Sequence, residues 1–129
     1  MNHEIIGGQL SLADGTKLPL SKAARAGDLV FLSGQLGMGA DAKLVGNDVA
    51  TQTKQNLENI KTLLGEANCS LSDVVKATGW LVNLEDFGSF NEVYASYFPN
   101  NPPPRSAVCS ALVLPGALVE IEVIAYSPK

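Results

Sequence analysis

The segment that decides the fold is residues 105–126, which read RSAVCSALVLPGALVEIEVIAY. Two runs of strand-forming residues, 106–113 and 117–126, flank the turn signal Leu114-Pro115-Gly116, and this spacing predicts a β-hairpin. One face of that hairpin is apolar and would face a core: Val108, Leu112, Val119, Ile121 and Val123. The other face carries small residues, one cation and two carboxylates: Arg105, Ala107, Cys109, Glu120 and Glu122. Such a mixture fits a subunit interface with a pocket in it.

The register of this hairpin separates its charged residues. With the turn at residues 115 and 116, Arg105 lies opposite Tyr126, so Glu120 is on the order of 20 Å away at the usual rise of a strand. If Arg105 and Glu120 serve one site, we therefore expect two different subunits to supply them.

The rest of the chain alternates between strand and helix patterns. We predict strands at 5–12, 28–36 and 74–82, and helices at 48–67 and 84–98. The nearly continuous apolar run Leu29-Val30-Phe31-Leu32 predicts a strand buried on both faces. The order β-β-α-β-α-β-β indicates one α+β domain, residues 1–129, with two helices on one face of a mixed sheet. Because the chain has little charge to cover the other face, we expect an oligomer.

Both helices have recognisable ends and faces. Val49, Thr53, Leu57, Ile60 and Leu64 recur at steps of three and four, which places them in one stripe of the first helix. Asn47 or Asp48 can cap its start, and Pro99 ends the second helix. The second helix presents aromatic residues: Phe87, Phe90, Tyr94, and Tyr97 or Phe98.

Composition excludes several classes of function. The 129 residues are 46% hydrophobic and carry a formal charge of −4, and they contain no basic cluster of the kind that binds nucleic acid. No run approaches the length of a membrane span, and residues 1–4 have neither the basic flank nor the apolar stretch of a signal peptide. A cytoplasmic protein with free thiols at Cys69 and Cys109 is therefore expected. With His3 as the sole histidine, we expect neither a metal site nor a Ser-His-Asp triad.

Several motifs, in order and at matching spacing over residues 18–126, resemble the Rid family of reactive intermediate deaminases, also called the YjgF/YER057c/UK114 family. They are the segments AGDLVFLSGQ (26–35), DVVK (73–76), LEDF (84–87), FNEVY (90–94), PPRS (103–106) and LPGALVEIE (114–122). The resemblance implies a chorismate-mutase-like fold and a homotrimer whose sheets form a central barrel, with ligand clefts between subunits. It also implies hydrolysis of 2-enamine or 2-imine carboxylates to 2-keto acids and ammonia, without a cofactor.

The resemblance assigns roles to individual residues. Arg105 matches the arginine that holds the substrate carboxylate, a task suited to the planar fork of a guanidinium; the alternative is a structural ion pair with Glu120 or Glu122. Glu120 matches the glutamate that positions the attacking water, although Glu122 is an equally acidic neighbour.

Three further positions belong to the predicted site. Ser33 could donate to a carboxylate or orient water, or could satisfy a local backbone group instead. Gly34 offers an unobstructed backbone amide, and Asn91 matches an asparagine near the cleft. Trp80 is expected in a core or an interface rather than in the site.

Two positions depart from the family pattern. Leu20 stands where many deaminases have a tyrosine whose hydroxyl lines the site, and Ala107 stands where many have a cysteine. The leading hypothesis is imine hydrolysis with Arg105, Glu120 and Ser33 as catalytic residues. Leu20 keeps a second hypothesis open, a non-catalytic trimeric binding protein for small carboxylates such as 2-keto acids. An endoribonuclease activity fits poorly with the acidic charge and the lack of a histidine base.

Overall fold

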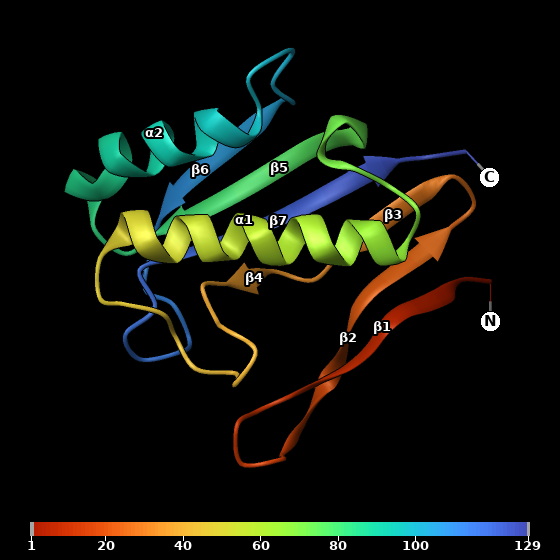
Figure 1. Cartoon of the computed structure of the whole chain (residues 1–129), viewed down its shortest axis with the longest axis horizontal. Coiled ribbons are helices and arrows are strands. Elements are labelled where there is room, and N and C mark those ends of the chain that lie inside the picture. The colour runs from red at the N-terminus through yellow and green to blue at the C-terminus, as the bar shows by residue number, and fades with distance from the viewer. Residues whose placement is uncertain (1, 129) are drawn as a thin grey trace.

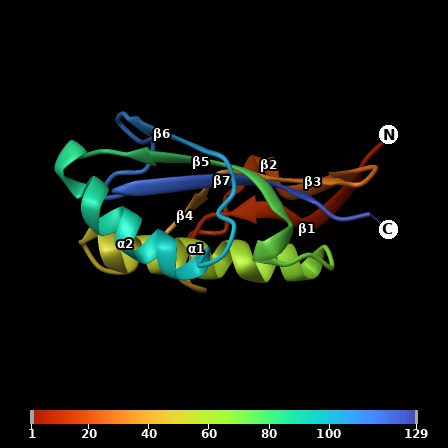
Figure 2. The same cartoon turned by 90° about the horizontal axis from the view of Figure 1, so that it is seen from above.

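The computed structural model describes residues 2–128, which form one sheet with both helices on the same face (Figures 1 and 2). The strands are β1 (Glu4–Ser11), β2 (Lys17–Ala26), β3 (Leu29–Leu32), β4 (Gln35–Leu36), β5 (Val74–Leu81), β6 (Arg105–Cys109) and β7 (Val119–Tyr126). The helices are α1 (Val49–Glu66) and α2 (Phe87–Tyr97), with short 3-10 turns η1 (Leu71–Asp73) and η2 (Leu84–Asp86). The strand order is β1-β2-β3-β7-β5-β6, and β4 also pairs with β7. The predicted mixed α+β fold is confirmed.

Helix α1 lies along the sheet and covers most of its length (Figure 1). It begins at the predicted cap, because the Asp48 carboxylate accepts from the Thr51 amide at 2.9 Å. The buried face of α1 also has a polar part that holds β4. Asn56 Nδ2 donates to the Gln35 carbonyl at 2.6 Å, and Asn59 Nδ2 donates to the Leu36 carbonyl at 3.2 Å.

The prediction that the two C-terminal strands form a hairpin is wrong, because β6 and β7 do not pair with each other. The turn itself forms, since the Ala117 amide donates to the Leu114 carbonyl at 3.1 Å. However, β5 lies between β6 and β7, parallel to the first and antiparallel to the second. Helix α2 is the crossover that connects β5 to the parallel strand β6 (Figure 1). Strand β6 is thereby left at the edge of the sheet.

The N-terminal half holds two further differences from the expectation. Strand β2 was not predicted, and it pairs with both β1 and β3. The predicted strand 28–36 is divided into β3 and β4, and β3 is buried on alternate residues rather than on both faces. Val30 and Leu32 are buried under α1, whereas Leu29 and Phe31 are 37% and 41% exposed on the open face of the sheet.

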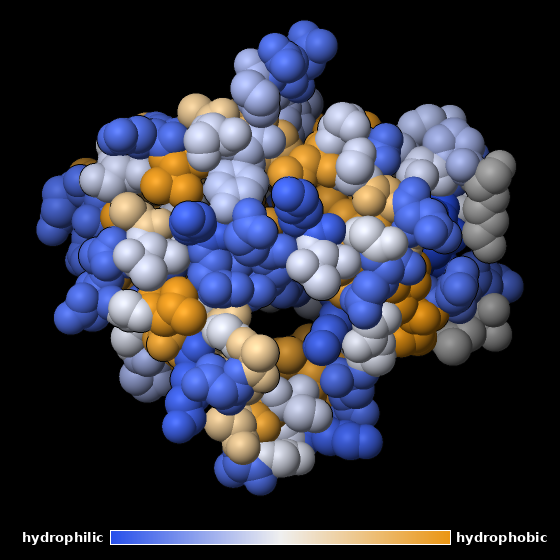
Figure 3. All heavy atoms as spheres, viewed as in Figure 1, coloured by the Kyte–Doolittle hydropathy of each residue, from blue (hydrophilic) through white to orange (hydrophobic). Residues whose placement is uncertain are grey.

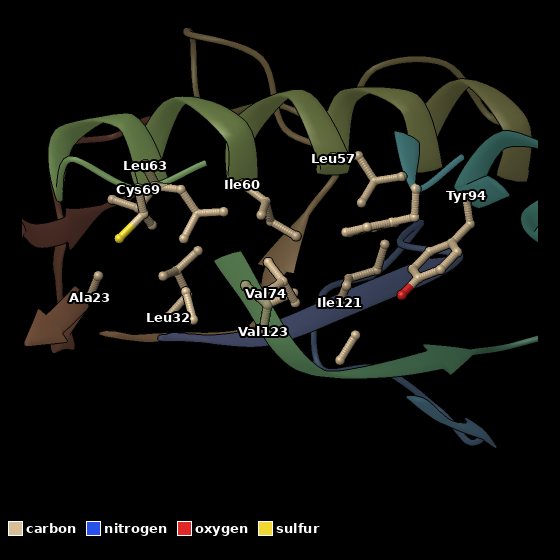
Figure 4. Packing of buried hydrophobic residues seen from close by; sticks show 14 of the residues in the cluster. Ala23, Leu32, Leu57, Ile60, Leu63, Cys69, Val74, Tyr94, Ile121 and Val123 are labelled. Carbon is tan, nitrogen blue, oxygen red and sulfur yellow. The ribbon is translucent and has the colours of Figure 1, made fainter. Parts of the chain in front are cut away.

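The core lies between the helices and the sheet (Figure 4). Leu57, Ile60 and Leu64 of α1 are fully buried against Ile121 and Val123 of β7. Cys69 is buried and Cys109 is exposed, and both are free thiols, as predicted. Within residues 2–128, no helix is long and apolar enough to cross a membrane.

Candidate functional site

Arg105 is the first residue of β6, where three prolines end and pairing with β5 begins. The Pro104 carbonyl accepts from the Ala77 amide at 3.0 Å, which ties the entry of β6 to the neighbouring strand. Proline restricts its own φ and the conformation of the residue before it, so the run 102–104 leaves few backbone conformations for the segment that leads into Arg105.

The Arg105 side chain points to the helix side of the sheet, against α2. Its guanidinium carbon lies 4.7 Å from the centre of the Tyr94 ring, 5.4 Å from that of Phe90 and 5.7 Å from that of Phe87. Among residues 2–128 the guanidinium has no carboxylate partner and makes no hydrogen bond. The alternative of a structural ion pair with Glu120 or Glu122 is therefore wrong, and the donors of Arg105 are unoccupied.

Glu120 is the second residue of β7, on the opposite, open face of the sheet, beside Trp80 of β5. Its carboxylate packs against Gly34, where a Cβ atom would overlap the Glu120 carboxyl group. Burial raises the pKa of the Glu120 carboxyl group, and the neighbouring carboxylate of Glu122 raises it further. A carboxyl group with a raised pKa, half-buried and without a hydrogen bond among the described residues, is suited to receive and return a proton.

Ser33 lies next to Gly34, in the link between β3 and β4. Its hydroxyl donates to the Ser21 carbonyl at 2.6 Å. The backbone-satisfying role that we weighed for Ser33 is thus the one seen, and only the lone pairs of its oxygen remain available. Gly34 lies beside the Glu120 carboxyl group, and the substrate-binding role of its backbone amide stays a prediction.

Of the remaining predicted residues, Ala107 and Asn91 lie on the elements around Arg105, and Leu20 lies on the strand beside Ser33. Ala107 is exposed on β6, two residues after Arg105 and on the same side of the strand. Asn91 is half-buried on α2, one turn from both Phe87 and Tyr94. Leu20 is 37% exposed on β2, the strand that also holds Ser21 beside Ser33.

The candidate site thus consists of two halves on opposite faces of one chain. Arg105 pairs with Ala77, while Glu120 pairs with Trp80 on the other side of β5. Two strand spacings and three residues of rise separate them by roughly 14 Å. The expectation that they share one face is wrong, because it depended on direct pairing of β6 with β7. In this register Arg105 and Glu120 lie on opposite faces of the sheet, so two chains are needed if both serve one site.

The aromatic residues beside Arg105 were missed as part of the site. Their spacing on α2 is visible in the sequence, but the sequence pattern favours a core stripe. Their contact with Arg105 depends on the α2 crossover and on the β5–β6 pairing, which local patterns do not contain.

A groove elsewhere in the molecule includes none of the predicted site residues. It has a volume of about 490 Å³ and separates the β1–β2 hairpin from α1 and the segment after β4; Figure 3 shows the hollow below α1. Its walls are mainly polar, with Lys22 and Glu66 as the charged residues. Across residues 2–128, no group of three or more His, Cys, Asp or Glu side chains is arranged to hold a metal ion.

Fold and candidate site together define the class: a small α+β protein with one mixed sheet, helices on one face, and charged groups divided between its two faces. Comparison with known proteins gives the family. Residues 13–127 match the family described as Endoribonuclease L-PSP. The chain belongs to this family, which is also the Rid or YjgF/YER057c/UK114 family.

Relatives and solved structures agree with this assignment. A RutC family protein of Pyrococcus abyssi is 42% identical over 109 residues, which cover 84% of this chain and 86% of that protein. The human protein named 2-iminobutanoate/2-iminopropanoate deaminase is 38% identical over 114 residues, covering 88% of this chain and 83% of the human one. The crystal structure of RidA from an Antarctic Psychrobacter matches with a TM-score of 0.84 at 34% identity, covering 95% of this chain and 98% of that chain.

Proposed function

We propose that this protein hydrolyses reactive 2-imine and 2-enamine carboxylates to 2-keto acids and ammonia, without a cofactor. The observation that carries the proposal is Arg105, a half-buried cation at an exposed strand edge whose donors have no partner among residues 2–128. The human, bovine and rat relatives named as 2-iminobutanoate/2-iminopropanoate deaminases support the choice of substrate.

The proposed reaction needs only an anchor and a proton carrier. Arg105 binds the substrate carboxylate through two parallel N–H···O bonds. Glu120 accepts a proton from water as the water oxygen bonds to the imine carbon, and the C=N bond becomes a C–N single bond. Glu120 then returns this proton to nitrogen, which gives a carbinolamine. It next takes the proton of the carbinolamine hydroxyl and passes it to nitrogen as the C–N bond breaks and the C=O bond forms, so that ammonia and the 2-keto acid are released. The Ser33 hydroxyl donates its hydrogen bond to the Ser21 carbonyl, so its oxygen contributes an acceptor for a hydrogen bond from the water.

We further propose that the site is shared between subunits of a homotrimer. The separation of Arg105 and Glu120 on opposite faces of the sheet supports this arrangement. So does the apolar character of the open face, on which Leu29, Phe31 and Val108 are 37%, 41% and 44% exposed. Apolar groups of this size gathered on one sheet face favour burial by a partner.

A second candidate function is supported by one position. Leu20 is an exposed leucine where many deaminases supply a hydroxyl group. Without that group, the chain could bind small carboxylates such as 2-keto acids and leave the imine unreacted.

One assay separates the two functions. The protein, its Arg105→Ala variant and its Leu20→Tyr variant are given 2-iminobutanoate generated in situ, and both ammonia release and semicarbazide-trapped imine are measured. Deamination predicts acceleration over buffer that Arg105→Ala reduces by about 100-fold, since two charge-assisted hydrogen bonds are lost. Binding of 2-ketobutyrate without acceleration, with activity appearing in Leu20→Tyr, would support the binding protein. Neither binding nor acceleration by the wild type would refute both.

A further inference from the structure

We infer that the aromatic wall formed by Phe87, Phe90 and Tyr94 is the device that positions Arg105 for an anionic ligand, with Tyr94 as its principal positioning residue. This inference rests on the proposed function, because it concerns how the same carboxylate is bound.

The aromatic wall takes the place that an acidic residue commonly has beside a half-buried arginine. Tyr94 is nearest, at 4.7 Å from ring centre to guanidinium carbon, and Phe90 and Phe87 complete the wall at 5.4 and 5.7 Å. All three distances lie within the roughly 6 Å over which a ring attracts a cation. A carboxylate would cancel the positive charge and occupy N–H donors. An aromatic ring attracts the cation through its π electrons and leaves those donors for the ligand.

Burial makes Tyr94 and Phe90 the stronger part of the aromatic wall. Phe90 is fully buried and Tyr94 is 5% exposed, whereas Phe87 is 40% exposed at the rim. Cation–π attraction grows when water is excluded. Arg105 also acts on Tyr94 in return: burial raises the pKa of the Tyr94 hydroxyl, and the positive charge of Arg105 opposes that rise.

The Tyr94 ring is itself held in place from both sides. Its centre lies 5.6 Å from that of Phe90 and 4.8 Å from that of Phe98, both within the range of favourable ring pairs. Gly79 of β5 makes room for this stack, since a Cβ there would lie 3.1 Å from Phe90 Cζ. Figure 4 shows the Tyr94 side chain reaching from α2 toward Ile121 of the sheet.

The hydroxyl of Tyr94 has no part in this role. It is buried and finds no hydrogen-bond partner among residues 2–128. If the ring alone positions Arg105, phenylalanine at this position restores what leucine removes. A role through the hydroxyl predicts the opposite.

The chain offers a matched set of variants. Tyr94→Leu removes the ring nearest Arg105, Tyr94→Phe keeps that ring, and Phe98→Leu removes a neighbouring buried ring that is not among the three rings under the guanidinium. Phe98→Leu therefore removes a support of the Tyr94 ring but leaves that ring beside Arg105, so only a part of the effect is expected. Phe87→Leu adds a variant at an exposed position that folding tolerates.

Two readouts are required. The first is KM and kcat for imine hydrolysis together with the Kd of 2-ketobutyrate. We expect Tyr94→Leu to raise KM and Kd roughly three- to thirtyfold, the range of a lost cation–π contact, with a smaller change in kcat. Tyr94→Phe should restore the wild-type KM, Phe98→Leu should raise KM less than Tyr94→Leu does, and Phe87→Leu should raise KM about two- to threefold.

The second readout is the NMR shift of the Arg105 Hδ and Hε protons, which adjoin the guanidinium carbon that lies over the rings. Arg25 is the internal reference, because the chain has only these two arginines. Loss of the ring-current shift in Tyr94→Leu but not in Phe98→Leu is expected. Unchanged Arg105 shifts in Tyr94→Leu, or equal KM increases in Tyr94→Leu and Phe98→Leu, would overturn the inference. The NMR readout needs no activity, so a wild type that neither binds nor hydrolyses would refute the proposed function while the shifts still decide the role of the aromatic wall.

Discussion

The two arginines of the chain have opposite surroundings. Arg25 lies on β2 and is 7% exposed; it donates to the Ser127 carbonyl at 2.7 Å and to the Ala67 carbonyl at 2.9 Å. It joins the end of α1 to the end of the chain. Arg105, half-buried at the start of β6, donates to no group among residues 2–128. Arg25 therefore has a structural role, in which its guanidinium bonds to backbone carbonyls, whereas the donors of Arg105 have no partner among the described residues.

The same contrast holds for two carboxylates. Glu58 of α1 accepts from the Tyr97 hydroxyl at 2.7 Å, an interaction that joins the two helices. Glu120 is half-buried and accepts from no described residue, while burial and Glu122 raise its pKa. A half-buried ionic group without a partner costs stability. We therefore interpret the two unpartnered groups, Arg105 and Glu120, as retained for a ligand.

The largest effect expected from this comparison is the loss of stability in Arg25→Met. Methionine replaces the apolar length of the side chain but removes the hydrogen bonds from Arg25 to the Ala67 and Ser127 carbonyls. We expect the free energy of unfolding to fall by about 2–4 kcal/mol, measured by urea denaturation. The KM of the folded protein should not change.

The control for Arg25→Met is Lys61→Met, a substitution of an exposed cation on α1 that should change stability by less than about 0.5 kcal/mol. A loss below about 1 kcal/mol in Arg25→Met would show that the buried ties contribute little.

The next largest effect is expected for kcat in Gly34→Ala, because Gly34 leaves room for the Glu120 carboxyl group. In Gly34→Ala the added methyl group overlaps the Glu120 carboxyl group, so the carboxylate must move. We expect kcat to fall about 10- to 100-fold, because small displacements of a catalytic group are costly, with less effect on the Kd of 2-ketobutyrate. Ala107→Gly, at an exposed position beside the other half of the site, is the comparison variant. A kcat within twofold of the wild type in Gly34→Ala would argue against a catalytic role for Glu120.

The sequence predicted the site residues and helix α1, but it did not predict how the C-terminal strands pair. The family motifs identified Arg105, Gly34 and Glu120, and helix periodicity placed α1 within one residue of its observed ends. The pairing of β6 could not be predicted from the turn at residues 115 and 116, because a hairpin signal is local and β5 enters between the two strands from 24 residues before β6. That single insertion moves Arg105 to the other face of the sheet and against α2.

Strand β2 was missed for a different reason. Its sequence, KLPLSKAARA, contains a proline and no β-branched residue, so local propensity argues against a strand. Pairing on both sides, with β1 and β3, overrides that propensity. The same pairing buries Arg25, which sequence patterns gave no reason to select.

A smaller effect is expected when Arg105 is replaced by methionine and stability is measured. Because the guanidinium has no hydrogen bonds to lose, only its cation–π contacts disappear, and the free energy of unfolding should change by less than about 1 kcal/mol. Urea denaturation beside Arg25→Met gives the comparison directly. Equal losses of unfolding free energy in Arg25→Met and Arg105→Met would contradict the distinction between a hydrogen-bonded arginine and one without hydrogen bonds.

The smallest effect is a change in pH dependence on removing the charge of Glu122. Burial, the larger cause of the raised pKa of Glu120, remains in Glu122→Gln, but the repulsion from Glu122 is lost. The pKa of Glu120 should then fall while staying above its ordinary value of 4.5. If ionised Glu120 accepts the proton from water, the acid limb of the kcat profile moves to lower pH. Glu92→Gln, an exposed change on α2, should leave the limb in place.

The pH dependence of the stability of Glu122→Gln gives an independent measurement of the same change in the pKa of Glu120. A carboxyl group whose pKa is raised on folding contributes stability that is present below its unfolded pKa and is lost as the pH rises through the folded one. Glu122→Gln should therefore be more stable than the wild type at pH 7, by less than about 1 kcal/mol, and the gain should vanish near pH 4. A gain that is equal at both pH values would mean that Glu122 acts on packing rather than on the charge of Glu120, and the contrast between tied and free carboxylates would then depend on burial alone.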